Sequence, residues 1–183
     1  KRLYSFSTFG TSNCKAKASA NKQLFDITLF TETAVWTDNG KIDFYLDTHN
    51  HAKDYWGSSL ISSHPDVQAG KSKAASRQVE VNVDASSTTK SESQDEQTKV
   101  TVNSIDFAEF LLHNFTAADH IVVKMDIEGA EYAVLEKLVR TGAYLLIDVL
   151  VIEYHPYVAP KPNLEAGLTW LFESANITVV TWL

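Results

Sequence analysis

The sequence predicts an α/β fold in which parallel strands alternate with helices. Short apolar runs, typical of buried strands, recur through residues 104–183. Stretches of helical periodicity separate these runs, and strands joined through helices form parallel sheets with right-handed crossovers. The length of 183 residues and the 44% hydrophobic composition fit one globular domain with a sizeable core.

The first part of the chain, residues 1–47, is typical of strands and turns. Apolar and polar residues alternate over several short runs there, as they do in half-buried strands. The turn Asp38-Asn39-Gly40 predicts a hairpin between the two runs that flank it. The predicted strands are residues 3–6, 25–30, 33–36 and 41–46.

The middle of the chain, residues 48–100, is polar and irregular. Residues 84–99 contain no large apolar side chain. Such a segment cannot bury enough surface to offset the entropy lost on ordering, so we expect a mobile loop there. Short strands at residues 78–83 and 100–103 are predicted to flank it as a hairpin with a long loop.

The last part of the chain predicts a regular α/β unit. Ser104 is the expected N-cap of its first helix, and Gly142 is expected to close the second. The predicted helices are residues 106–114, residues 129–140 and a segment whose shared face carries Leu164, Leu168, Leu171 and Phe172. The predicted strands are residues 121–126, 144–154 and 177–182.

Charge and cysteine content exclude some classes of function. The formal net charge of -7 and the lack of a basic block argue against a nucleic-acid-binding protein. The single cysteine, Cys14, leaves no disulfide within the chain and no cysteine-based metal site. No apolar run approaches the roughly 20 residues that span a bilayer. None of these observations identifies the compartment in which the protein works.

Charged residues follow two of the predicted strands at their carboxyl ends, where open parallel sheets bind ligands. Lys124, Asp126 and Glu128 lie two residues apart, so an extended strand would point them to one side. Glu153 and His155 end the next strand. Such carboxylates can act as a base, bind a metal or bind hydroxyl groups. The alternative is structural, because acidic residues also stabilise the start of a helix.

The segment VVKMDIEGAEYAVLEKL, residues 122–138, closely resembles the signature of the FkbM-type methyltransferases. These S-adenosylmethionine-dependent enzymes mostly methylate hydroxyl oxygens. Weaker matches occur in the family's order at residues 33–40, 57–60, 100–106 and 151–155. The resemblance implies a Rossmann-like class I methyltransferase sheet with helices on both faces and a long polar insertion.

The sequence also departs from the family pattern. No glycine-rich cofactor loop precedes Phe25, and Ser7 stands where the family usually has an acidic residue for the cofactor ribose. We therefore expect residues 1–183 to form a single but partial methyltransferase-like domain, incomplete at its N-terminus. An upstream segment or a partner chain would complete the sheet, because a missing central strand leaves unpaired edges.

The resemblance implies S-adenosylmethionine-dependent O-methylation of a sugar, glycan or small-metabolite hydroxyl. The alternative is a non-catalytic, methyltransferase-like structural or binding subunit of a larger assembly. The implied catalytic residues are Asp126 and His155, the acceptor-binding residues are Glu128, Glu153 and Ser59, and the cofactor-binding residues are Ser7, Ala34, Val35 and Lys124. No metal is expected.

Two further patterns are minor alternatives. His49-Asn50-His51 is similar to part of a nuclease or metal site, and Asp126 with Glu128 resembles the Asp-x-Asp metal site of nucleotide-sugar glycosyltransferases. Neither pattern has a second motif to support it.

Overall fold

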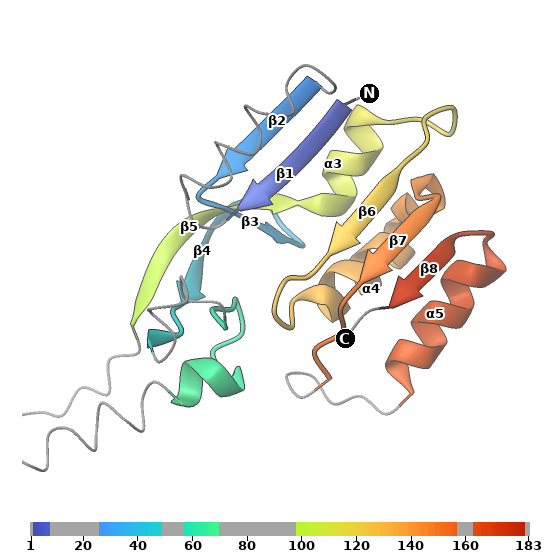
Figure 1. Ribbon diagram of the computed structural model, residues 1–183. Coiled ribbons are helices and arrows are strands. Elements are labelled where there is room, and N and C mark those ends of the chain that lie inside the picture. Colours follow the sequence, from blue (N-terminus) through green and yellow to red (C-terminus); the bar gives the residue numbers. More distant parts are fainter. Residues whose placement is uncertain (1, 8–25, 49–56, 70–97, 157–162, 182–183) are drawn as a thin grey trace, which may run out of the picture.

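The computed structural model describes residues 2–7, 26–48, 57–69, 98–156 and 163–181 (Figure 1). Its strands form three hydrogen-bonded groups, in the orders β1-β2, β3-β5-β4 and β6-β7-β8. The strands are β1 (Arg2–Ser7), β2 (Asp26–Thr31), β3 (Thr33–Trp36), β4 (Gly40–Tyr45), β5 (Lys99–Asp106), β6 (Val122–Met125), β7 (Val149–Ile152) and β8 (Thr178–Thr181). The helices include α3 (Phe107–Asn114), α4 (Glu131–Thr141), the 3-10 helix η3 (Ala143–Leu146) and α5 (Leu164–Ser174). Residues 65–69 are helical as well.

The C-terminal unit confirms the predicted alternation of strands and helices. β6, β7 and β8 pair in parallel, with α4 between the first two strands and α5 between the last two. Gly142 ends α4 with a φ of 76°, a left-handed conformation that glycine adopts without steric cost. The expected strand at 144–154 starts later than predicted, because η3 follows Gly142 directly. The Asp148 carboxylate then accepts the Ile121 backbone N–H at 2.7 Å, beside the start of β7.

The predicted hairpin between residues 33–36 and 41–46 is wrong. β5 lies between β3 and β4, parallel to β3 and antiparallel to β4. The turn residues bind β5 as well, since the Asn39 amide oxygen accepts the Asp106 backbone N–H at 3.0 Å. A strand that returns from much further along the chain is therefore the partner of both runs. The other predicted hairpin cannot be followed, because residues 78–83 lie outside the described ones.

The first helix of the C-terminal unit begins two residues later than the Ser104 cap predicts. Ser104 continues β5, and its hydroxyl donates to the Asp38 carbonyl at 2.8 Å. Asp106 is the N-cap of α3, where its carboxylate accepts the Glu109 backbone N–H at 3.1 Å. The same carboxylate contacts Lys137 of α4 at 2.6 Å, so one residue joins the end of a strand to two helices.

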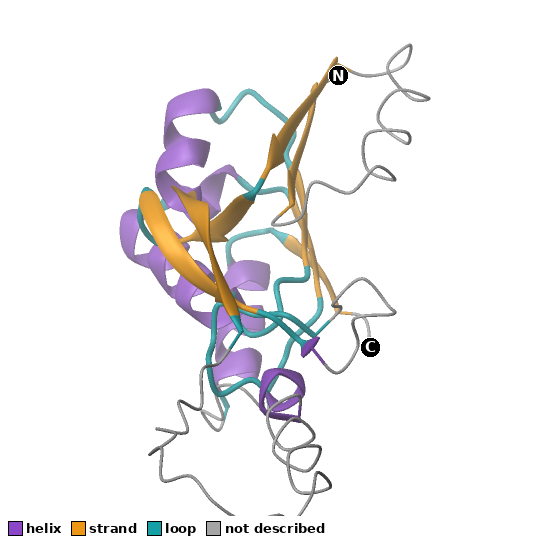
Figure 2. Ribbon diagram, turned by 90° about the vertical axis from the view of Figure 1, so that its left-hand side faces the viewer, coloured by secondary structure: helices purple, strands orange, loops and turns teal. Residues whose placement is uncertain are grey.

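The main hydrophobic core lies between the C-terminal strands and the helices α3, α4 and α5. In Figure 2 these helices lie on one side of the strands. The most buried side chains of this main core include Leu135, Leu138, Leu150, Ile152 and Phe172. A second, smaller cluster joins Ala34, Phe44 and Val102 across the β3-β5-β4 group. Helices on the other face stay a prediction, since residues 8–25 between β1 and β2 are outside the described part. No described helix is long and apolar enough to cross a membrane.

A slot separates β1 from β6. The two strands lie side by side and point the same way (Figure 1), but among the described residues no ladder of hydrogen bonds joins them. A cavity of about 170 Å³ follows the slot, lined by β1, β6, α3 and Val35 of β3. Tyr4 and Phe6 of β1 contact the Phe110 ring of α3 edge-on. The edges of β1 and β6 and the apolar side chains of α3 therefore border the same cavity.

Candidate active site

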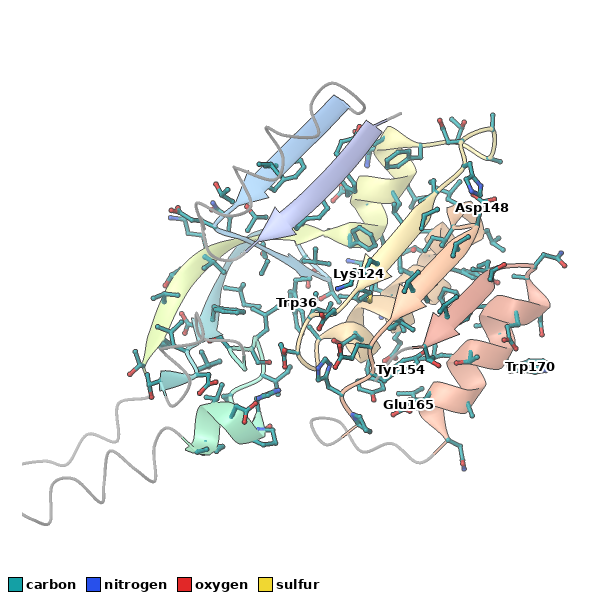
Figure 3. All side chains as sticks on the ribbon, in the orientation of Figure 1. Trp36, Lys124, Asp148, Tyr154, Glu165 and Trp170 are labelled. Carbon is teal, nitrogen blue, oxygen red and sulfur yellow. The ribbon has the colours of Figure 1, made fainter. Side chains whose placement is uncertain are left out.

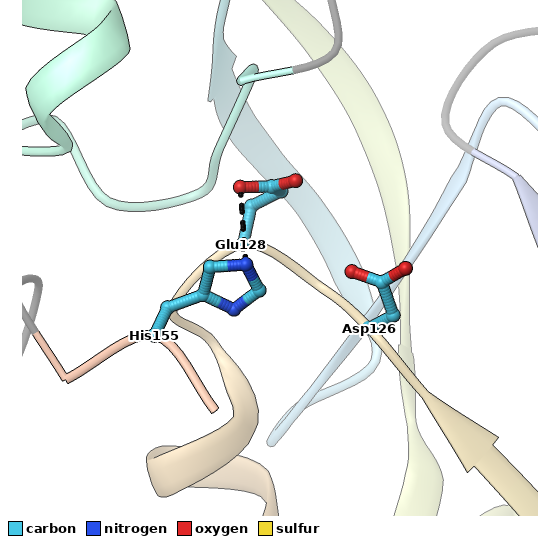
Figure 4. Close-up of side chains that lie close together, drawn as sticks. All are labelled: Asp126, Glu128 and His155. Carbon is cyan, nitrogen blue, oxygen red and sulfur yellow. Dashed lines mark ion pairs between the residues drawn. The ribbon is translucent and has the colours of Figure 1, made fainter. Parts of the chain in front are cut away.

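Polar side chains gather where β6 and β7 end (Figures 3 and 4). The loop 126–130 leads from β6 into α4 and carries Asp126 and Glu128, and His155 follows β7. Glu128 has a φ of 53° and Gly129 a φ of 96°. Two successive residues with positive φ turn the chain sharply. This turn places the Glu128 carboxylate against His155, whose Nε2 lies 3.4 Å from Glu128 Oε2.

Glu131 stabilises this turn through hydrogen bonds to its backbone. Sequence patterns did not identify Glu131 as a site residue. It is completely buried, and its carboxylate accepts the backbone N–H groups of Ile127 at 2.8 Å and Gly129 at 2.9 Å. Its Oε1 also lies 3.0 Å from His155 Nδ1. One carboxylate therefore fixes both the loop and the imidazole. Its position in the first turn of a helix, just after a glycine, was the only signal available.

Residues 57–69 reach the site from the other side. Gly57 has no room for a side chain, because an added Cβ would come within 2.4 Å of Asp66 Cβ. Ser59 pairs with Tyr45 of β4 through the backbone. Its hydroxyl donates to the Glu128 carbonyl at 2.5 Å and accepts the Ile61 N–H at 2.9 Å. Ser59, expected to bind the acceptor, is thus fully buried and contacts the site through the main chain of Glu128.

His64 is the second residue that the sequence did not indicate. It is fully buried, and its Nδ1 accepts the Asp66 backbone N–H at 3.3 Å. An imidazole that accepts at Nδ1 carries its proton on Nε2. That Nε2 lies 3.2 Å from Glu128 Oε2, so the N–H edge of His64 faces the carboxylate. His64 thereby confines Glu128 to the position in which it meets His155.

His155 has the opposite tautomer. Its Nδ1 carries the proton, because this atom faces the Glu131 carboxylate. In the neutral ring the lone pair on Nε2 then points toward Glu128 and Glu153, whose oxygens lie 3.4 Å and 3.9 Å away. Burial opposes a charge on the ring, but the hydrogen bond to Glu131 and the three surrounding carboxylates outweigh it. The pKa of His155 is therefore raised above its ordinary value.

The remaining predicted residues lie around this centre. Lys124 Nζ is 3.3 Å from Asp126 Oδ2, and both side chains are exposed to solvent. Asp126, Glu128 and His155 offer three donor atoms that lie within 4.8 Å of one another, so together they could hold a metal ion. Among the described residues, this is the set of three such side chains whose donor atoms lie this close together. His49 and His51 lie outside the described residues.

On the expected cofactor side, the residues are more dispersed. Val35 and Lys124 line the slot between β1 and β6. Ala34 is 3% exposed and packs with Phe44 and Val102 in the smaller core cluster. Ser7 is the last residue of β1, and the arrows of β1 and β6 point the same way in Figure 1. The described residues therefore build one side of a pocket in detail and border the other side only in part.

Comparison with known protein families identifies a match that covers most of the chain. The family model described as the Methyltransferase FkbM domain matches residues 12–164, which is most of the chain. The matched range includes the loop 126–130, Ser59, His64, Glu131 and His155. No curated protein matches the chain. No solved structure matches it either.

Proposed function

Because this chain belongs to the FkbM methyltransferase family, we propose that the protein transfers a methyl group from S-adenosylmethionine to a hydroxyl oxygen. The acceptor would be a sugar, a glycan or a small metabolite. The proposal is carried by one observation, the meeting of Asp126, Glu128 and His155 at the carboxyl ends of β6 and β7. This is the edge where open α/β sheets bind their ligands.

The chemistry of O-methylation matches what these side chains can do. S-adenosylmethionine supplies a methyl group on a positively charged sulfur, which keeps the bonding electron pair when the methyl group leaves. The acceptor oxygen must approach in line with that bond and lose its proton, so positioning supplies much of the rate. Asp126 would orient the hydroxyl, and the Nε2 lone pair of His155 would accept its proton.

The carboxylates suit an acceptor that carries several hydroxyl groups. Glu128 and Glu153 are partly exposed, with side-chain exposures of 27% and 32%. Ionised carboxylates accept hydrogen bonds only, and hydroxyl groups donate them. Glu128 and Glu153 would thus bind further hydroxyl groups of the acceptor beside the one that is methylated. Ser59 would contribute indirectly, by holding the Glu128 carbonyl.

The residues present fit only part of the cofactor side. Val35 and Lys124, which line the slot, would border the adenine and the methionine ends, and Ser7 would lie near the ribose. Ala34 would contribute backbone alone, because its side chain is buried in the smaller cluster. We further propose that a parallel strand pairs with both β1 and β6 in the slot and completes a Rossmann-like sheet. That strand would come from an upstream segment or from a partner chain.

Two measurements test the proposal. Calorimetry with S-adenosylhomocysteine measures cofactor binding, and transfer of labelled methyl groups to a panel of polyhydroxylated acceptors measures turnover. His155→Gln should retain cofactor binding and lower kcat by about 100- to 10,000-fold, the usual contribution of general acid-base catalysis. His113→Gln is the matched control, because His113 is exposed on α3 and its ring contacts the Glu109 carbonyl of the same helix.

Each result has a definite reading. A folded full-length protein that binds no S-adenosylhomocysteine would contradict the proposal and favour the alternative, a non-catalytic structural or binding subunit. Equal turnover by His155→Gln and His113→Gln would remove His155 from the catalytic machinery.

A further inference from the structure

The cluster at the ends of β6 and β7 has the composition of a metal site. Asp126 and Glu128 offer carboxylate oxygens and His155 an imidazole nitrogen, and the three donor atoms lie within 4.8 Å of one another. First-row divalent cations have ligand distances of about 2.0–2.2 Å for such donors. Small side-chain rotations would bring three atoms so close together onto one ion. Asp126 is exposed, so its carboxylate can rotate from Lys124 toward the others, whereas His155 is 4% exposed and held by Glu131.

The surroundings of His155 form a second, independent observation. A metal-bound histidine almost always donates its other ring N–H to a carboxylate or carbonyl, which fixes the ring and its tautomer. Here the buried Glu131 carboxylate accepts the hydrogen bond from His155 Nδ1, at 3.0 Å. The Nε2 lone pair is therefore aimed into the cluster, toward the Glu128 and Glu153 oxygens. The carboxylate, histidine and open ligand position are in place together.

The negative charge around the site also favours a bound cation. The carboxylates around His155 favour positive charge at Nε2, which a proton supplies in the free protein and a bound cation would supply in its place. Four carboxylates surround the site, from Asp126, Glu128, Glu131 and Glu153, and the Lys124 ammonium neutralises one of them at Asp126. The excess negative charge would lower the energy of a divalent cation placed among these groups.

We propose that Asp126, Glu128 and His155 bind a divalent first-row transition-metal cation of the Mn²⁺ or Zn²⁺ class. Two carboxylates and one imidazole match these ions, since carboxylates alone suit Mg²⁺ and Ca²⁺ and imidazole suits zinc and its neighbours. Water or a substrate oxygen would fill the remaining positions. His64 would be a positioning residue, because its Nε2 holds Glu128 Oε2 at 3.2 Å.

Binding of the cation stands apart from methyl transfer, and only its catalytic consequence rests on the proposed function. A bound cation lowers the pKa of an oxygen that it ligates. With Nε2 occupied, His155 would act as a ligand and not as the base, and the metal-bound acceptor hydroxyl would pass its proton to the Glu153 carboxylate or to a solvent water. Stripped protein and metal-loaded protein would then deprotonate the acceptor by different routes.

The test uses protein stripped with a chelator and titrated with Mn²⁺, whose free form gives a strong electron paramagnetic resonance signal. Saturable loss of that signal at one ion per chain is expected, with displacement by Zn²⁺. Glu128→Gln and His155→Gln should each weaken Mn²⁺ binding by more than about 10-fold, because even the outer partners of metal ligands contribute about 10- to 100-fold. Glu173→Gln on α5 and His113→Gln on α3 are matched controls and should bind as the wild type does.

Circular dichroism of every variant separates lost ligands from lost structure. Asp126→Asn changes an exposed residue, so it keeps the test valid should a buried variant unfold. Absence of saturable binding to the folded wild type overturns the proposal. Binding that is indifferent to Asp126→Asn and His155→Gln also overturns it. Calorimetry with S-adenosylhomocysteine on the same samples reports the cofactor site separately, so either proposal can fail alone.

Discussion

Glu131 is the residue whose replacement tests the account of the site most directly. In Glu131→Gln the shape is kept, but one carboxylate oxygen becomes an NH2 group that cannot accept a hydrogen bond. The side-chain carbonyl will face Ile127 N–H and His155 Nδ1, which share one oxygen in the wild type. The NH2 group then faces the Gly129 N–H, where the wild type has an acceptor at 2.9 Å.

The structure sets the size of the effect. Glu131 is fully buried and the backbone of Gly129 is buried, so no water replaces the lost acceptor. An unsatisfied buried donor costs about 1–3 kcal/mol, and bonds to a charged acceptor lie toward the upper end. We expect Glu131→Gln to lower the free energy of unfolding by about 2–3 kcal/mol. Glu131→Leu, which leaves both N–H groups without an acceptor, should cost about twice as much.

Urea denaturation measures the free energy of unfolding, and amide hydrogen exchange locates the change. Exchange at Ile127 and Gly129 should accelerate in Glu131→Gln more than exchange within β7. Glu136→Gln, an exposed change on the same helix, is the control and should alter the free energy of unfolding by no more than about 0.5 kcal/mol. If Glu131→Gln behaves like Glu136→Gln and both amides keep their protection, Glu131 does not support the turn.

Four further substitutions test three other features of the molecule. Gly142→Ala should lower the free energy of unfolding by about 1 kcal/mol, because Gly142 has a φ of 76°; Gly167→Ala, within α5 and facing open space, should raise it by about 0.4–1 kcal/mol, and equal signs in thermal unfolding would contradict this reasoning. Burial and the hydrogen bond to Glu165 raise the pKa of Tyr132. The unfolded chain will therefore lose this proton above pH of about 10 while the folded protein keeps it, so stability falls with rising pH by up to about 1.4 kcal/mol per unit. Tyr132→Phe should flatten that fall between pH 9 and 11 in urea unfolding, and an unchanged slope would refute the assignment. Ser59→Ala should cost about 1–3 kcal/mol, since the Glu128 carbonyl and the Ile61 N–H both lose their partner; a melting temperature equal to that of the wild type would remove Ser59 as a support.

Local patterns predicted the elements that are local in the structure. The apolar run before Asp126, the glycine at 129 and the helical periodicity that follows fixed a strand, a turn and a helix, and β6 and α4 confirm them. Asp38-Asn39-Gly40 misled for the opposite reason. Its turn chemistry is real, but the flanking strands find a better partner in β5, which returns from residues 99–106. Pairing at that sequence distance leaves no short-range signal.

The residues of the site also fall into two groups, those visible in local sequence patterns and those whose role depends on the folded structure. Lys124, Asp126 and Glu128 were predictable as a group because charged residues at the end of an apolar strand are visible in the sequence. The predicted geometry was wrong, because β6 ends at Met125 and a turn at Glu128, not an extended strand, positions the carboxylates. His64 and Glu131 were not predictable, because their roles depend on burial and on contacts made across the fold. An isolated histidine before Pro65 and a glutamate at a helix start are common for structural reasons alone. Only the structure reveals that the Nε2 atoms of two imidazoles, His64 and His155, approach the same Glu128 oxygen.

The contacts of residues 57–69 also bear on how the protein folds. Ser59 and Glu128 are 69 positions apart in the chain, and their hydrogen bond joins the β3-β5-β4 group to the C-terminal unit. Closing a loop of that length is entropically costly, so contacts of this kind form slowly. We expect the parallel unit of β6, β7 and β8 to form first and the two imidazoles to meet around Glu128 near the end of folding. A collapsed chain in which residues 57–69 have not yet docked would have most of its hydrophobic core. It would lack the contacts of Ser59 and His64 that position Glu128 in the site.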